Sequence, residues 1–148
     1  MSENTRPNRG SNASERIVHL VIAALAVGGY SLERAWDLRP KLEREGLVDP
    51  KVVEMLDEAE VVRRLATCGY DRGPIVTASM ASRLIALHAA VRIGVLAQTS
   101  ELMQNGRLQD AEKVLRRVKG VGPMVFRQFA ILEGVGRKVD ENSPTPIR

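Results

Sequence analysis

A chain of 148 residues with 44% hydrophobic content is long enough to bury a core of its own, and we expect one domain. Its single cysteine, Cys68, excludes an internal disulfide and any zinc or iron–sulfur site built from four cysteines of the chain. The net charge of +4 is mild, so its distribution along the chain is more informative than its sum.

The first 13 residues are rich in Ser, Asn, Pro and Arg and carry almost no apolar side chain. This composition predicts a flexible N-terminal tail, 1–13. The tail lacks the layout of a signal peptide, and the longest apolar run, 17–30, is too short to span a membrane. The sequence therefore predicts a cytoplasmic protein without a membrane partner.

Apolar residues at helical spacing over 17–25 predict a first helix that begins at Ser14 and ends at the glycine pair 28–29. Ser31 is a favoured N-cap residue, so a second helix should begin there, with a kink or a restart at Pro40. The side chains that this second helix is expected to bury are Leu32, Ala35 and Trp36.

Asp49 and Pro50 predict the start of a further helix, which the apolar pattern continues to Thr67. A break is expected at Asp57, because Asp57 and Glu60 have the spacing of a capping box. After a turn at 68–74, a long helix over 75–93 is apolar on most sides and should run through the centre of the domain. Shorter helices are expected over 100–104, 108–118 and 123–132. No segment alternates with the period of a strand, so the predicted class is all-α.

The last two predicted helices are joined by Gly120-Val121-Gly122-Pro123, within the stretch VKGVGPMVFRQFAILEG. The glycines permit positive φ and the close approach of a foreign backbone, and proline suits the first turn of the second helix. Free N–H groups at that helix's N-terminus would face outward as an anion site. Val121 should insert between the two helices. The pattern predicts a helix-hairpin-helix motif that suits a phosphate.

Basic residues gather on both sides of this turn. Between Lys113 and Lys138 the chain has seven bases against one acid, Glu133, a net +6 that leaves the remainder at −2. A solvated helix face is the ordinary explanation of such a run, but its position beside the glycine turn favours an anionic partner. The seven bases are Lys113, Arg116, Arg117, Lys119, Arg127, Arg137 and Lys138.

Three segments carry a resemblance to a known family: HLVIAALAVGGYSLERAWDLRPKL, VVRRLATCGYDRGPIVTASMASRLIAL and LRRVKGVGPMVFRQFAIL. They resemble the opening helix pair, the glycine-turn-helix segment and the hairpin of the helix-hairpin-helix DNA glycosylase superfamily, of the endonuclease III and adenine glycosylase type. The resemblance implies one helical domain over 14–140, a C-terminal tail at 141–148, and a hairpin that holds the backbone of double-stranded DNA. The residues implied to contact DNA are Arg117, Lys119, Gly120, Val121, Gly122, Pro123, Met124, Arg127 and Lys138.

The resemblance also implies a candidate reaction, the release of a base during base-excision repair. In the family an aspartate, usually in a Val-Asp pair, follows the hairpin and lies at the mouth of the base pocket, and here Asp140 occupies that place. Bifunctional members carry a nucleophilic lysine where this chain has Met124, so no lyase chemistry is expected. Candidates for lining a base pocket are Tyr30, Trp36 and Tyr70, with packing in the core as the alternative.

Two expectations about cofactors follow from the same resemblance. The family's hairpin binds a monovalent cation through backbone carbonyl groups, which by position would be those of Arg116, Val118 and Val121. The cysteines that hold an iron–sulfur cluster in the family, and its returning C-terminal helices, have no counterpart here, so no cluster is expected. Whether a partner protein or a second copy of the chain supplies the missing helices is left open.

Three functions are compatible with the sequence. A DNA-binding module that keeps the hairpin without catalysis is favoured. A monofunctional DNA glycosylase using Asp140 is the first alternative, and a helical protein-interaction domain that binds no DNA is the second.

Overall fold

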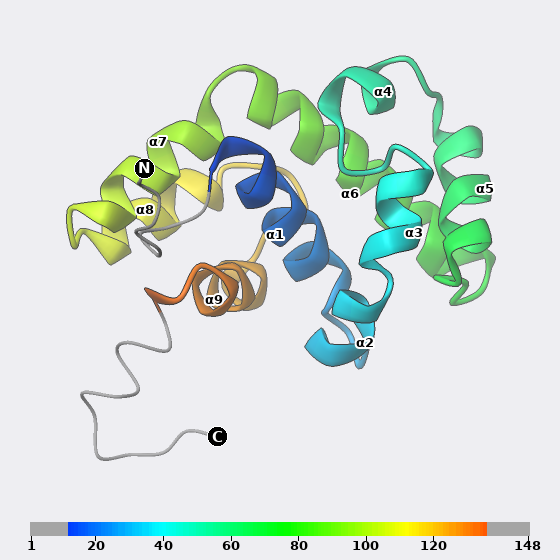
Figure 1. Cartoon of the computed structure of the whole chain (residues 1–148), viewed down its shortest axis with the longest axis horizontal. Coiled ribbons are helices and arrows are strands. Elements are labelled where there is room, and N and C mark those ends of the chain that lie inside the picture. The colour runs from blue at the N-terminus through cyan, green and yellow to red at the C-terminus, as the bar shows by residue number, and fades with distance from the viewer. Residues whose placement is uncertain (1–11, 136–148) are drawn as a thin grey trace, which may run out of the picture.

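The computed structural model describes residues 12–135 (Figure 1), and within this range the chain forms nine α-helices and no strand. The predicted all-α class is thus confirmed for the described part of the chain. The helices are α1 (Ala13–Leu25), α2 (Leu32–Asp37), α3 (Arg39–Arg44), α4 (Pro50–Glu54), α5 (Glu58–Cys68), α6 (Pro74–Arg92), α7 (Val95–Gln104), α8 (Leu108–Leu115) and α9 (Pro123–Leu132).

Side-chain caps fix several helix starts. The Oδ1 atom of Asn12 accepts a hydrogen bond from the Glu15 amide at 2.8 Å, so α1 begins one residue earlier than predicted. Ser31 caps α2 as expected, and Asp49 caps α4. The predicted break is also confirmed, because α4 ends at Glu54 and Asp57 caps the separate helix α5.

Helix α6 lies at the centre of the described fold and contacts α1, α4, α5 and α7. Its inward side buries Met80, Ala81, Leu84 and Leu87. The expectation that it is enclosed on most sides is wrong at its first turn, where Ile75 is 83% exposed. Among the described helices, α6 alone has the length and composition to cross a membrane, a test that the core helix of a soluble protein also passes.

The first and last described helices lie side by side. Every residue of α1 from Val18 to Leu25 is buried, and α9 packs against it with Phe126 and Phe129. In Figure 1, α9 lies beneath the middle of α1, while α7 and α8 form a pair at one end of the molecule. This arrangement places the connection between α8 and α9 next to the core and not at a loose end of the fold.

Three predicted boundaries or burials are wrong. Helix α7 begins at Val95, well before the predicted residue 100, because Gly94 in a left-handed conformation (φ 96°) starts it and Leu96 packs into the core. Helix α8 ends at Leu115, before the predicted residue 118, because the next amides bond three residues back, as in a turn. Trp36 is 38% exposed, since the short helix α2 buries only Ala35.

Candidate nucleic-acid interface

Helices α8 and α9 are joined by residues 116–122, called here the α8–α9 turn. The Val118 amide donates to the carbonyl of Leu115 at 3.1 Å, and the Val121 amide donates to the carbonyl of Val118 at 3.0 Å. Val118 and Val121 are both 8% exposed and belong to the core cluster, as does Val125 in α9. Apolar burial therefore holds the turn against the body of the protein, as the sequence pattern predicts for Val121.

The two glycines of the turn have different conformations. Gly120 has φ 88°, and a Cβ added there would lie 2.6 Å from Cγ of Arg83, so only glycine fits without a shift. Gly122 has φ −111° and ψ −171°, extended backbone that any residue adopts, and a Cβ there would meet nothing within 4 Å. The expectation that Gly122 supplies positive φ is therefore wrong.

Gly122 is the N-cap of α9, and no side chain of the described residues caps this helix end. The first hydrogen bond of the helix runs from the Phe126 amide to the Gly122 carbonyl at 3.3 Å. Pro123 has no N–H, and Met124 beside it is 48% exposed. The amides of Gly122, Met124 and Val125 have no acceptor within 12–135, which leaves the positive end of the helix dipole available to an anion.

Four bases around the α8–α9 turn are exposed and have no carboxylate partner in the described part of the chain. They are Lys113, Arg117, Lys119 and Arg127. Arg116 is also exposed, but its Nη1 lies 3.4 Å from a carboxylate oxygen of Glu112. The exposed surface of this segment is consequently basic, because four of its five exposed bases have no neutralising carboxylate in the described range.

The one acid of the segment, Glu133, is turned away from this surface. Its Oε2 lies 2.6 Å from Nδ1 of His19, and its side chain is only 6% exposed. The other ring nitrogen of His19 lies 3.3 Å from Glu15, which in turn accepts two hydrogen bonds from Arg39. The Arg39 guanidinium lowers the pKa of Glu15. This network ties α9 to α1 and α3, and it removes the acid from the basic face.

Arg83 is a neighbour of the turn that sequence reasoning missed. It belongs to α6, far from the turn in sequence, yet the Cγ and Cδ atoms of its side chain cover the Cα of Gly120. It has no carboxylate partner within the described residues. No spacing in the sequence relates Arg83 to the glycine turn, because only the packing of α6 brings them together.

The structure brings together two of the three aromatic residues proposed for a base pocket. The rings of Tyr30 and Tyr70 meet edge to face with centroids 5.0 Å apart, and both side chains are buried. The ring centroid of Trp36 instead lies 5.9 Å from that of His19, and the guanidinium carbon of Arg39 lies over the Trp36 ring, 5.3 Å from its centroid. The two tyrosines pack in the core, which was the alternative to a pocket role.

Two of the expected site residues, Lys138 and Asp140, lie outside the described residues. Of the three carbonyl groups expected to bind a monovalent cation, that of Val118 already accepts the Val121 amide, whereas those of Arg116 and Val121 accept no amide within 12–135. A carbonyl oxygen has two lone pairs, so the Val118 carbonyl also keeps an acceptor position, and no step of the binding proposed below requires a cation. No cluster of His, Cys, Asp and Glu suited to a metal occurs in the described range.

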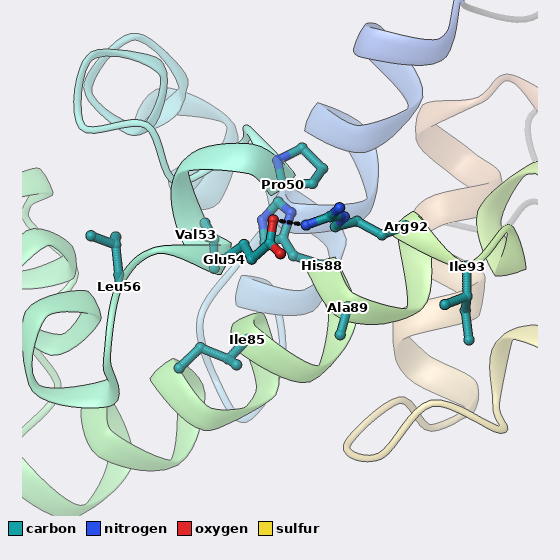
Figure 2. Close-up of a pocket in the computed structure, with 9 residues that line it drawn as sticks. All are labelled: Pro50, Val53, Glu54, Leu56, Ile85, His88, Ala89, Arg92 and Ile93. Atoms are coloured by element: carbon teal, nitrogen blue, oxygen red, sulfur yellow. Dashed lines mark ion pairs between the residues drawn. The ribbon is translucent and has the colours of Figure 1, made fainter.

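A separate cavity of about 440 Å³ lies between α4 and α6 (Figure 2). An ion pair between Glu54 and Arg92 crosses it, as the dashed line in Figure 2 shows. His88 lies at its wall and donates from Nε2 to the carbonyl of Leu47 at 2.8 Å, and burial lowers the pKa of this histidine. None of the residues expected to contact DNA or a base lines this cavity. Its apolar lining consists of Pro50, Val53, Leu56, Ile85, Ala89 and Ile93.

Comparison of the chain with protein-family models, with curated proteins and with solved structures gives no match. The function must be inferred from the residues of the chain themselves.

Proposed function

We propose that the α8–α9 turn is the hairpin of a helix-hairpin-helix motif and that the protein binds the phosphate backbone of double-stranded DNA through it, without catalysis. One observation carries this proposal. Four exposed bases around the turn, Lys113, Arg117, Lys119 and Arg127, have no carboxylate partner in the described range, while the only acid of the segment is buried against His19. A surface of this kind attracts a polyanion.

The backbone of the turn supports the same function. Val118, Val121 and Val125 are buried and hold the start of α9 in one position, so its open amides are preorganised and lose little freedom when they bind. A phosphate oxygen accepts hydrogen bonds from such amides, and Lys119 beside them adds a charge-assisted contact. Contacts of this type position a protein on DNA but do not read bases. Binding should therefore be largely independent of sequence.

The proposal is tested by the salt dependence of duplex binding. Contacts with three or four phosphates should give a slope of log K against log salt of roughly −3 to −4. The double variant Arg117→Gln/Lys119→Gln should reduce the magnitude of the slope by about 2, with little change in thermal stability because both side chains are exposed. Fluorescence anisotropy of a labelled duplex between 50 and 200 mM salt, roughly the range over which such contacts are lost, measures both quantities.

The matched control is Lys41→Gln/Arg44→Gln on α3, where two exposed bases also lack a carboxylate partner within residues 12–135. This variant should keep the slope of the unmodified protein. An equal effect of both double variants would indicate attraction by net charge alone. Failure of the unmodified protein to bind a duplex at low salt would overturn the proposal and favour a helical protein-interaction domain.

A further inference from the structure

Arg83 has a stem that is packed against the α8–α9 turn. A Cβ at Gly120 would lie 2.6 Å from Cγ and 3.0 Å from Cδ of Arg83, so the aliphatic part of the arginine occupies the space that another residue's side chain would need. Only Nε separates Cδ from the guanidinium carbon, so the charge of Arg83 also lies close to the turn. Gly120 in turn is itself exposed. The contact thus brings a cation from α6 to the edge of an exposed backbone segment.

The guanidinium of Arg83 lacks the partners that three other half-buried arginines have, a lack that Nε of the half-buried Arg16 shares. Arg39, Arg64 and Arg72 are half-buried like Arg83, and each donates hydrogen bonds to a carboxylate or to backbone carbonyl groups. Arg83 has no ion pair and no hydrogen-bond acceptor within the described residues. Arginine often buries its stem and leaves its charged end available to solvent or to a ligand.

We infer that Arg83 binds a DNA phosphate beside the α8–α9 turn, so that the DNA-binding surface includes α6 as well as the two helices of the hairpin. This inference rests on the proposed function. The packed stem limits the motion of the side chain, which reduces the entropy lost on binding. A guanidinium can also donate two parallel hydrogen bonds to a phosphate, which the ammonium of lysine cannot do.

The test compares variants that separate the stem from the charge. Arg83→Met keeps an unbranched apolar stem against Gly120 and removes the charge, whereas Arg83→Lys keeps both a stem and a charge. Arg44→Met on α3 is the matched control, because Arg44 is exposed and has no carboxylate partner in the described part of the chain. Duplex affinity as a function of salt and the thermal unfolding midpoint are measured for each variant.

Arg83→Met should bind a duplex about tenfold more weakly, the effect of losing one charged hydrogen bond, and should reduce the magnitude of the salt slope by about 1. Arg83→Lys should keep the slope of the unmodified protein, and Arg44→Met should keep both slope and affinity. A purely structural role of Arg83 would lower the unfolding midpoint without changing the slope. Arg83→Gln, also neutral, replaces Arg83→Met if that variant does not fold.

The possible failures are distinguishable. If the unmodified protein binds DNA and Arg83→Met keeps its full salt slope, the role of Arg83 is overturned while the proposed function stands. If the unmodified protein does not bind DNA, both are overturned. A lower slope in Arg44→Met equal to that of Arg83→Met would also overturn the inference, because the effect would then not depend on position.

Discussion

Gly120 and Gly122 are two residues apart, but the backbone requires glycine only at the first. At Gly120 the left-handed conformation and the packed stem of Arg83 both exclude a side chain. At Gly122 the backbone is extended and the space around it is open. The fold of the chain therefore requires glycine at Gly120. Under the proposed function, glycine at Gly122 is required instead by the close approach of a phosphate.

Gly120→Ala should lower the free energy of unfolding by about 1–3 kcal/mol, since a residue with a Cβ is strained in the left-handed region. Gly122→Ala should change it by less than about 0.5 kcal/mol, but its methyl group would occupy the space beside the open amides and weaken duplex binding. Urea unfolding and duplex titration measure the two effects. An equal loss of stability in both variants would contradict the difference in backbone conformation described here.

Because His88 is buried, we expect the stability of the protein to depend on pH. Burial lowers its pKa below the ordinary value of 6.5, so the folded protein holds the ring neutral while the unfolded chain binds a proton. Because the unfolded state binds more protons, the contribution of His88 to the free energy of unfolding is fully present above about pH 6.5 and decreases as the pH falls below that value. This contribution is lost on acidification and not on making the solution alkaline.

The variant His88→Gln should show a flatter decline between pH 7 and 5, because glutamine can still donate to the Leu47 carbonyl and does not titrate. Urea unfolding at several pH values measures the slope, and the carboxylates that also titrate in this range are common to both proteins. A decline of the same steepness in the variant would show that His88 does not contribute to it.

At the scale of helices, features that depend on neighbouring residues could be predicted from the sequence. Ser31, Asp49 and Asp57 cap their helices as expected, because each caps an amide no more than three residues away. The end of α8 and the exposure of Trp36 were predicted wrongly, because both depend on how short helices meet the core. The candidate site follows the same rule: its turn was visible in the sequence, whereas Arg83 was not.

A buried polar contact between Glu133, at the end of α9, and His19 of α1 adds to the apolar packing of the two helices and can be tested directly. Glu133→Gln removes the charge that faces His19 and should lower the free energy of unfolding by about 1–3 kcal/mol, the range for a hydrogen bond to a charged group. Glu112→Gln in α8 is the matched control, since its pair with Arg116 is more exposed and longer at 3.4 Å. Its effect should stay below about 0.5 kcal/mol.

Thermal or urea unfolding measures the stability of both variants. If Glu133→Gln and Glu112→Gln are equally stable, the contact between Glu133 and His19 contributes no more than an ordinary surface pair. If Glu133→Gln loses stability but keeps its affinity for a duplex, the contact positions α9 without taking part in DNA binding.

At the scale of the whole molecule, the all-α class was predictable because helical periodicity recurs along the chain and strand periodicity does not. The arrangement of the helices was only partly predictable. The apolar character of α6 indicated a central position, which its contacts with four other helices confirm. Its exposed first turn, and the pairing of the first described helix with the last, depend on tertiary packing that no local pattern encodes.

The pairing of α1 with α9 has a consequence for how the chain folds. Contacts between segments so far apart in sequence are slow to form, because the entropy of closing a long loop is lost before the contacts lower the free energy. During synthesis α1 emerges before α9, and its buried stretch from Val18 to Leu25 stays without this cover until α9 has left the ribosome. Until α9 emerges, the nascent chain thus carries an apolar surface that is prone to aggregation. The turn before α9 acquires its final surroundings only when α9 has packed against α1.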